Sequence, residues 1–216
     1  KTGDKKYAFE VEVANKLLSH LEAGKPARTC PLSNEEKEVV DGWFLLTTKP
    51  VLYAANIAED DIGKKDSDNP YVVAVQNIAK QEHAEALVIS AQIEQEIASM
   101  PESERQEYLS ALGIEKSGLD LMIQTSYRLL GLISFLTSGE DECRAWTSKQ
   151  GTKAPQAAGK IHTDFEKGFI RAEIVPYDTL MQHGSMAACR EKGLVRSEGK
   201  EYVMQDGDVT LFRFNV

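Results

Sequence analysis

The sequence of 216 residues holds only three cysteines, Cys30, Cys143 and Cys189, which lie far apart and form no Cys-x-x-Cys pair. An odd count without paired spacing argues against a disulfide framework and favours reduced thiols. The four histidines do not stand at ligand spacing with these cysteines, so we expect no metal site. Together these features predict a cytoplasmic protein.

Long apolar stretches are also missing. No run reaches the length needed to cross a bilayer, and the start, Lys1-Thr2-Gly3-Asp4, has no apolar signal region. We therefore expect no membrane partner. The first residue is not Met, which is compatible with a processed chain, a truncated one or part of a longer one.

Basic residues are fewer than acidic ones: the sequence has 25 Lys and Arg residues and 34 Asp and Glu residues, which gives a net charge of -9. This balance argues against a protein whose whole surface binds nucleic acid, and we expect no DNA specificity. A local basic face on the protein surface is still compatible with this net negative charge. The length suffices for one large or two small domains.

Residues 5–23 carry apolar side chains every three or four positions and predict an amphipathic helix. Since a turn at Gly3-Asp4 precedes it, we interpret the helix as the second arm of a helical hairpin. Packing of this stripe on the main body is the alternative. Ser33 followed by Glu36 is a capping-box pattern that predicts a short helix through Phe44.

A strand–helix–strand pattern comes next. Residues 51–55 and 86–89 are short, continuously apolar runs, typical of strands buried on both faces, and Asn69-Pro70 opens a helix between them. Such a crossover gives parallel neighbours. The carboxyl ends of the strands, at Asn56 and at Ser90-Ala91, therefore meet on one edge, where ligands bind in sheets of this type. Helices are expected to follow at about 92–99, 102–111 and 117–130. Most of the glutamates on the first two, Glu94, Glu96, Glu104 and Glu107, are expected on solvated faces.

After Gly131 the pattern changes to short strands and turns, which predict a compact α+β domain separate from the parallel sheet. The expected strands are 132–136, a segment from Ala145-Trp146 to Gly151, a half-buried strand at 169–174, and strands at 201–203 and 209–214 around a turn at 205–208. The expected helices are 154–161 and 177–190, the second with Asp178 as its cap. Trp146 and Phe169 are expected in the core.

The motif Asn56-Ile57-Ala58-Glu59 follows the first buried strand, where small GTPases carry Asn-Lys-x-Asp to recognise guanine. Glu59 in place of Asp weakens guanine selectivity, and Ile57 in place of Lys still covers a face of the base. Ser90-Ala91 supports a base in such domains through backbone N–H groups, although a strand end with small residues is the plain alternative. Together the two motifs favour a nucleotide site formed by Asn56, Ile57, Glu59, Ser90 and Ala91.

Three longer segments are far more specific than these short motifs. They are Thr48 to Asp61, Arg144 to Glu173 (its matching parts being 144–147 and 151–173), and Gln205 to Val216. The first resembles the base-recognition segment of the YchF/Obg-like ATPase family, and the other two are similar to that family's TGS domain. The resemblance covers essentially the whole chain.

The resemblance implies an α/β plus α+β fold in three parts. Residues 1–43 would be one arm of a coiled-coil hairpin and a linker, 44–130 the C-terminal half of a nucleotide-binding domain with a partial P-loop NTPase parallel sheet, and 131–216 a β-grasp (ubiquitin-like) TGS domain. With half of its sheet and one arm absent, the region 1–130 is expected to expose apolar surface and to be less resistant to proteolysis than the rest.

The family begins with a phosphate-binding loop, whereas no Gly-x-x-x-x-Gly-Lys-[Ser/Thr] occurs in this sequence. The resemblance implies that the intact protein binds and hydrolyses ATP, or GTP less selectively, with Mg²⁺, and that its catalytic groups lie upstream. We expect no hydrolysis by this chain alone, because phosphate positioning and charge stabilisation dominate phosphoryl transfer.

Basic and acidic residues interleave after Gly131, which by itself favours a mixed solvated surface. The resemblance favours a surface that faces the ribosome or RNA, because TGS domains also occur in RNA-handling enzymes. Phosphate contacts would come from Lys and Arg side chains. The candidates are Arg144, Lys149, Lys153, Lys160, Lys167 and Arg171.

Two other functions compete with an ATPase. A stand-alone TGS-type interaction module without nucleotide hydrolysis is the first. The second is a metabolic enzyme that uses His162 as a base oriented by Asp164. These two residues lie two apart before a strand and no nucleophile accompanies them, so a structural histidine is the favoured interpretation.

Overall fold

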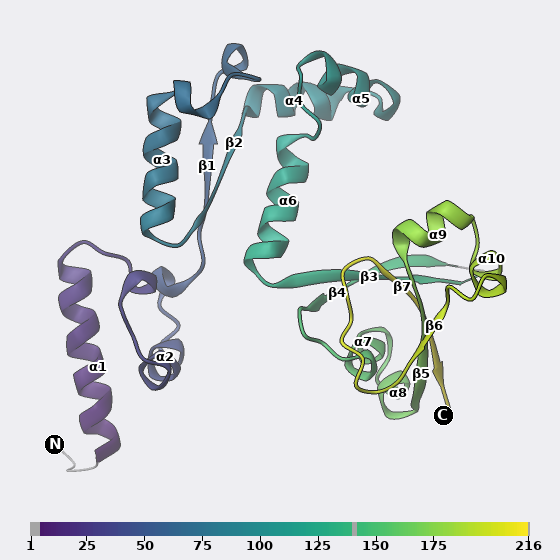
Figure 1. Cartoon of the computed structure of the whole chain (residues 1–216). Helices are drawn as coiled ribbons and strands as arrows, with labels where there is room; N and C mark the ends of the chain where they lie inside the picture. The colour runs from purple at the N-terminus through teal and green to yellow at the C-terminus, as the bar shows by residue number, and fades with distance from the viewer. Residues whose placement is uncertain (1–4, 140–141, 216) are drawn as a thin grey trace. The chain divides into compact units, whose positions relative to one another are not determined.

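The computed structural model describes residues 5–139 and 142–215, which form two compact units (Figure 1). The N-terminal unit ends at Leu129 and the C-terminal unit begins at Leu130. The turn expected at Gly3-Asp4 lies outside the described residues. Within these ranges no helix is both long enough and apolar enough to cross a membrane.

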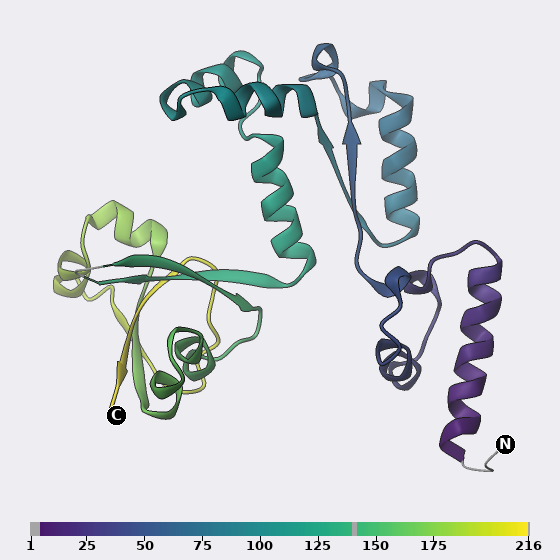
Figure 2. The same ribbon diagram turned by 180° about the vertical axis from the view of Figure 1, so that it is seen from behind.

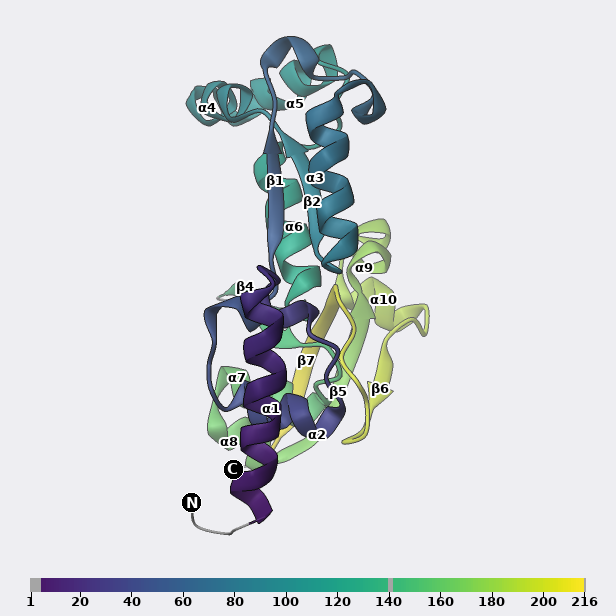
Figure 3. The same cartoon turned by 90° about the vertical axis from the view of Figure 1, so that its left-hand side faces the viewer.

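The N-terminal unit begins with α1 (Lys5–Glu22), as expected, and continues through the 3-10 turn η1 (Ala27–Thr29) to α2 (Asn34–Asp41) (Figure 3). The buried side chains of Val13 and Leu17 on α1 share a small apolar cluster with the linker and α2. The opposite face of α1 leaves Tyr7, Val11 and Leu18 exposed. These three residues belong to the apolar stripe that the sequence spacing identified, and within the described residues this stripe stays exposed rather than packing on the main body.

The capping box at α2 is confirmed. The backbone N–H of Glu36 donates to Ser33 Oγ at 3.2 Å, and the backbone N–H of Ser33 donates to Glu36 Oε2 at 2.7 Å. The helix ends at Asp41 rather than at Phe44. Phe44 has a φ of 51°, a left-handed conformation that cannot continue an α-helix.

The expected crossover is also confirmed: β1 (Leu52–Asn56) pairs in parallel with β2 (Glu85–Ile89) through α3 (Pro70–Gln81). Figures 1 and 2 show α3 and α6 (Gly118–Leu129) on opposite sides of this pair. Burial on both faces, expected for the first strand, is wrong for β1, because Ala54 is exposed. Among the described residues β1 pairs only with β2, so the other edge of β1 has no strand partner.

Helices α4 (Ala91–Ser99) and α5 (Glu102–Ala111) follow β2 as expected, and α6 follows them. Of the four glutamates expected mostly on solvated faces, Glu104 and Glu107 are exposed, whereas Glu94 and Glu96 make hydrogen bonds within the unit. The Glu94 carboxylate accepts the backbone N–H groups of Gly118 and Leu119 at 2.6 and 3.0 Å and so caps α6. Glu96 accepts a hydrogen bond from the Tyr108 hydroxyl, which raises the pKa of Tyr108 to about 12.

The C-terminal unit is built on a five-stranded sheet with the strand order β4-β3-β7-β5-β6. Strand β7 lies in the middle, parallel to β3 and antiparallel to β5. A mixed α/β architecture with one parallel and one mixed sheet, as predicted, is confirmed. The strands are β3 (Leu132–Ser138), β4 (Cys143–Lys149), β5 (Phe169–Pro176), β6 (Arg196–Glu198) and β7 (Asp208–Phe214).

Helices cover both faces of this sheet. Ile174 belongs to a core cluster with α7 (Ala154–Ile161), whereas its neighbour Val175 belongs to a second cluster with α9 (Tyr177–His183) and α10 (Met186–Glu191). Successive residues of a strand point to opposite faces, so the two clusters lie on opposite sides. Phe169 is in the first cluster and Trp146 packs against it, as expected.

The single helix expected at 177–190 is in fact two helices. Gly184 adopts a left-handed φ of 77° and ends α9, and Ser185 then caps α10 by accepting the backbone N–H of Ala188 at 3.1 Å. Asp178 is not a cap, since it lies within the first turn of α9, after Pro176. The apolar spacing runs through the break, which is why the sequence pattern did not reveal it.

The strand expected at 201–203 is also wrong. Val203 makes only an isolated bridge with Lys153, and the edge strand of the sheet is instead β6. The turn at 205–208 therefore joins no hairpin, because β7 pairs with β3 and β5. Strand β5 does not alternate as expected: residues 172–175 are all buried, since helices cover both faces.

Candidate functional site

The carboxyl ends of β1 and β2 meet as the sequence predicts. Asn56 Oδ1 accepts the backbone N–H of Ala91 at 2.9 Å. Just beyond it, the backbone N–H of Ile57 donates to the carbonyl of Ile89 at 2.8 Å. The Asn56 side chain therefore ties the end of β1 to the start of α4, and the backbone bond of Ile57 ties the following loop to the end of β2.

Glu59 follows in the 3-10 turn η3 (Glu59–Asp61), at the same edge of the sheet. Its Oε2 accepts a hydrogen bond from Gln92 Nε2 at 2.9 Å, and its Oε1 makes no hydrogen bond within the described part of the chain. No sequence pattern predicts the role of Gln92, because a glutamine in a helix is usually solvated. One carboxylate oxygen at this edge is thus held in place and the other is available.

Ser90 and Ala91 differ in their surroundings. Ala91 is exposed, whereas Ser90 is only 2% exposed, and its Oγ is buried without a hydrogen-bond partner in the part of the chain that the structure describes. An unpaired buried hydroxyl costs about 1–3 kcal/mol. Ser90 does not cap α4 with its side chain.

Two adjoining hollows of about 360 and 400 Å³ lie between the strand ends and the start of α3. Asn56 lines one and Ile57 lines both, whereas Glu59, Ser90 and Ala91 line neither. Volumes above roughly 300 Å³ are typical of small-molecule sites. The lining residues common to both hollows are Ile57, Asp61, Asn69, Tyr71 and Val72.

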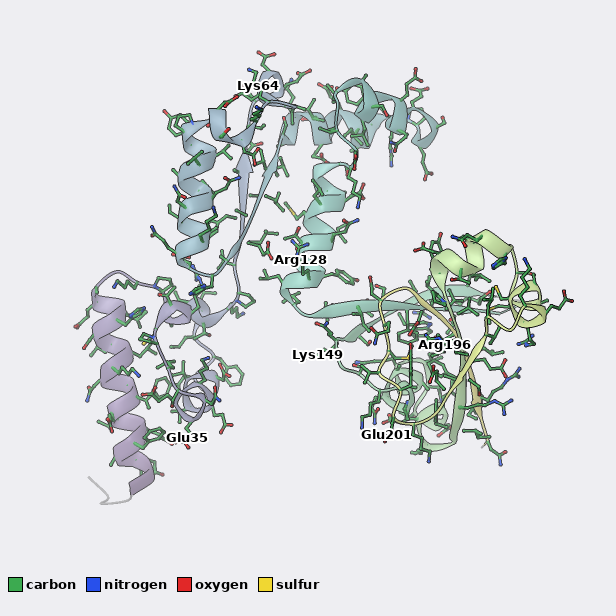
Figure 4. All side chains as sticks on the ribbon, in the orientation of Figure 1. Glu35, Lys64, Arg128, Lys149, Arg196 and Glu201 are labelled. Atoms are coloured by element: carbon green, nitrogen blue, oxygen red, sulfur yellow. The ribbon has the colours of Figure 1, made fainter. Side chains whose placement is uncertain are left out.

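The rim of these hollows is charged and aromatic. Lys64 donates to Asp61 Oδ1 at 2.8 Å, and this hydrogen bond raises the pKa of Lys64 (Figure 4). Tyr71 is 82% exposed at the start of α3 and was not predicted as a site residue. The strand-end residues supply an amide (Asn56), a carboxylate (Glu59) and an apolar side chain (Ile57), of which Asn56 and Ile57 line the hollows. We assign none of them to phosphate or Mg²⁺.

His162 serves a structural purpose. Its Nδ1 accepts the backbone N–H of Asp164 at 3.2 Å and so caps the short helix α8 (Thr163–Lys167). The Asp164 carboxylate lies 3.5 Å from the same nitrogen, and the His162 side chain is 61% exposed. The structural interpretation of His162 is therefore supported against a catalytic one.

The basic residues predicted to face RNA do not form one patch. Arg144 and Lys149 lie on the edge strand β4, whereas Arg171 lies on β5, two strands beyond β3. Figure 4 shows Lys149 on one side of this sheet and Arg196, in β6, at the other. Three of the six pair with single carboxylates: Arg144 with Glu142 at 4.0 Å, Lys153 with Glu201 at 2.6 Å and Lys167 with Asp164 at 4.0 Å. Lys160 is exposed on α7.

A different cluster surrounds Glu173 on β5. Arg213 on β7 donates its Nε to Glu173 Oε1 at 3.0 Å, and Arg190 on α10 donates to Oε2 at 2.9 Å. Arg171 donates to Oε1 at 3.5 Å. Hydrogen bonding from Arg213, more than any other contact, lowers the pKa of the Glu173 carboxyl to about 2, against the opposing effect of burial.

Sequence reasoning missed Arg190 and Arg213. One signal for Arg213 was present: Arg171 and Glu173 lie two apart on a strand and so share a face, and a basic residue on the neighbouring strand can meet them. Arg190 reaches the cluster from a helix, which no local pattern predicts.

Comparison with known proteins decides the family. A family model named YchF-GTPase_C, described as a protein of unknown function, matches residues 132–215. The "Ribosome-binding ATPase YchF" of Bacillus subtilis (strain 168) is 50% identical over 216 residues, which is all of this chain and 59% of that protein. The chain belongs to the YchF family. This confirms the resemblance drawn from the sequence.

Other YchF relatives agree. "Obg-like ATPase 1" of Caenorhabditis elegans is 40% identical over 217 residues, covering all of this chain and 54% of that protein. The solved structure of the Schizosaccharomyces pombe YchF GTPase matches with a TM-score of 0.79 and 37% identity, over 99% of this chain and 57% of that one. The chain thus spans a little over half the length of the YchF proteins that it matches.

Proposed function

We propose that this chain is the part of a ribosome-associated ATPase that recognises the nucleotide base and presents a surface to the ribosome or RNA. The observation that carries the first half is the hydrogen bond from the Ala91 backbone to Asn56, which joins the two predicted motifs at one edge. The names of its relatives, a ribosome-binding ATPase and an Obg-like ATPase, support both halves.

The three predicted parts are retained within this proposal. Residues 1–43 would be the hairpin arm and linker, 44–130 half of the nucleotide-binding domain, and 131–216 a TGS domain with a β-grasp fold. The sheet of the C-terminal unit supports the last assignment. Its middle strand is the last in sequence and lies between the first and third, as expected of a β-grasp, and α7 packs on one face.

ATP is the favoured nucleotide, with GTP accepted less selectively and Mg²⁺ accompanying the phosphates. Guanine presents a ring N–H and an amino group side by side, and a carboxylate reads both best when its two oxygens are available. Because Gln92 already donates to one oxygen of Glu59, the other oxygen is the one left with both lone pairs available to a base. That arrangement suits the lone exocyclic amino group of adenine. Base selectivity would then rest on Glu59 together with Asn56.

The test is an ATP titration of the complete parent protein with Asn56→Ala and Glu59→Gln. Each change should raise the Kd for ATP about tenfold, the size expected for losing one hydrogen bond to a charged or oriented group. Asp60→Asn is the matched control, because Asp60 is exposed next to Glu59 and makes no hydrogen bond among the described residues. ATP binding that is unaffected by both site changes would refute the nucleotide-site assignment.

A second function, an interaction module that acts without nucleotide hydrolysis, is favoured by the separate core of the C-terminal unit. Cosedimentation of the 216-residue chain with purified ribosomes tests the ribosome-facing half of the proposal. Binding without added nucleotide would support a surface that works by itself. Absence of cosedimentation at low salt would count against any ribosome-facing role of this chain.

A further inference from the structure

We propose that Arg171, Arg190 and Arg213, arranged around Glu173, form the site at which the C-terminal unit binds the phosphates of single-stranded RNA. The inference rests on the proposed RNA-facing role of this unit. It replaces the dispersed set of basic residues predicted from the sequence with one cluster, of which only Arg171 belonged to that set.

The first argument is charge. Three guanidinium groups meet one carboxylate, which leaves a net charge of about +2 at a single point of a chain whose total charge is -9. By contrast, the pairs Arg144–Glu142, Lys153–Glu201 and Lys167–Asp164 are each neutral. Phosphate binding draws its affinity from uncompensated Lys and Arg charge, so the cluster is favoured.

The second argument is the orientation of the donors. Glu173 is 8% exposed, whereas the three arginine side chains are between 48% and 53% exposed. The buried carboxylate therefore fixes one side of each guanidinium and leaves the remaining N–H groups directed away from it. Because the planar donors are held in place beforehand, less conformational entropy is lost when they bind a phosphate.

The third argument is the adjoining hollow of about 240 Å³, which Arg190 and Arg213 line together with Ser138, Met186 and Leu211. It lies below the range of roughly 300–1,000 Å³ typical of whole ligands, and suits a single unit of a chain. Its lining is mixed: the apolar side chains of Met186 and Leu211 can contact the face of an unstacked base, and the guanidinium planes of Arg190 and Arg213 can stack on one. A duplex keeps its bases paired, so the hollow favours a single strand.

The test measures binding of a fluorescein-labelled oligouridine to the 216-residue chain by fluorescence anisotropy at low salt. The double variant Arg171→Ala/Arg190→Ala removes two charges that each make one contact with Glu173, and it retains the Arg213 pair that holds this carboxylate. We expect its Kd to rise on the order of 100-fold, about tenfold for each charge-assisted contact. The slope of log K against log salt should fall by about 1.4, since each phosphate contact contributes about 0.7.

The matched control is Lys149→Ala/Lys160→Ala, which removes two exposed charges of the same unit that form no ion pair among the described residues. Its Kd should change less than about threefold. Arg171→Lys/Arg190→Lys keeps the charge and loses the planar fork, so it should bind between wild type and the alanine variant. Near-UV circular dichroism of each variant verifies that the fold is retained.

The outcomes separate this inference from the function on which it rests. If the control variant loses RNA and the cluster variant does not, the RNA-facing role stands and this site is wrong. If the wild-type chain binds no oligouridine at low salt, both the RNA-facing role and this site are wrong.

Competition experiments identify the ligand class. Competition by inorganic phosphate or ATP as effective as by unlabelled RNA would indicate a small-anion site. Equal competition by polyglutamate would indicate an acidic protein partner. Either result overturns the RNA assignment.

Discussion

At Glu173, burial and three guanidinium groups act in opposite directions on the same carboxyl. Burial alone would raise its pKa, whereas hydrogen bonds from Arg213 and Arg190 lower it from 4.5 to about 2. The ionised form is therefore the one that the folded C-terminal unit stabilises. Protonation would leave three positive charges around a neutral group.

The free energy of unfolding of the C-terminal unit should consequently decrease as the pH falls into the acidic range. A carboxyl whose pKa is lower in the folded state stabilises the fold above its unfolded pKa and loses that contribution as the pH falls. The window runs from pH 4.5 down to about 2, and the contribution lost is at most about 3 kcal/mol. Denaturant unfolding of a Trp43→Phe variant, followed by the fluorescence of Trp146, measures it.

Glu173→Gln is the control for this pH effect. It should lower stability at neutral pH, because an amide cannot neutralise the three arginines, and it should flatten the change in stability between pH 4.5 and 2. Since other carboxyls also titrate in this range, the difference between the two proteins is the informative quantity. Equal pH slopes in both would contradict the assignment.

Gln92→Ala tests the proposed base selectivity. Freeing the second oxygen of Glu59 should improve GTP binding relative to ATP by roughly threefold to tenfold, the worth of one added hydrogen bond. The measurement is the ratio of the two Kd values in the complete parent protein. Gln95→Ala, an exposed change on the same helix, should leave the ratio unaltered. A ratio shifted equally by both substitutions would mean that Gln92 acts through helix stability.

Single residues show which contacts of the candidate site could be predicted from the sequence. Asn56 and Ala91 could be placed together, because parallel strands end at the same edge and both positions follow directly from strand boundaries. The partners Gln92 and Arg190 could not, because their contacts depend on how a helix is rotated against a loop or a sheet. Such rotation is set by packing and leaves no local pattern.

At the scale of elements, Gly168 links α8 to β5 at a point where the backbone of Asn215 approaches it closely. A Cβ at this position would lie 1.9 Å from the carbonyl oxygen of Asn215, which follows β7. The same two residues are joined by the bond from Asn215 N to the Gly168 carbonyl at 2.9 Å. Strands β5 and β7 are fixed against each other here, where Phe165 also stacks on Phe214.

Gly168→Ala should therefore destabilise the C-terminal unit by about 2–4 kcal/mol, because backbone rather than a flexible side chain has to move. Gly199→Ala is the matched control, since a Cβ there meets nothing within 4 Å and the backbone is not left-handed. It should be neutral or slightly stabilising. Thermal unfolding of both variants measures the difference, and similar melting temperatures would refute the close approach.

Most elements were predictable from periodicity, and the two failures have different causes. The break between α9 and α10 is local, because a left-handed Gly184 ends one helix and Ser185 caps the next, whereas the apolar spacing continues through both. The edge strand β6 depends on tertiary pairing, because it forms only where β5 offers an unpaired edge. Residues 201–203 have the composition of a strand but find a single bridge partner. Local β propensity cannot predict which segment pairs with the free edge of β5.

At the scale of the whole molecule, the two units differ in how they are packed. The C-terminal unit has a main cluster of ten buried residues, whereas the clusters of the N-terminal unit hold five and three. Large apolar side chains are also exposed in the N-terminal unit, among them Phe44 at 86% and Tyr71 at 82%. Local opening is easier where few apolar contacts oppose it.

Limited proteolysis should therefore cut the N-terminal unit first and leave a resistant fragment that begins near Leu130. Mass spectrometry of a trypsin time course identifies the fragment, and a second protease with apolar specificity checks that the result does not reflect the positions of Lys and Arg. Equal resistance of both units would contradict the expectation.

The separate clusters carry a thermodynamic consequence. Cooperativity requires that all parts of a chain lose their structure together, and a chain that divides into two compact units is not bound to do so. A calorimeter should then record two heat-absorption peaks, so that the sum of their enthalpies exceeds the van't Hoff value for either one. Each substitution discussed above should displace only the peak of the unit that contains it, so that the chain is expected to show two melting temperatures.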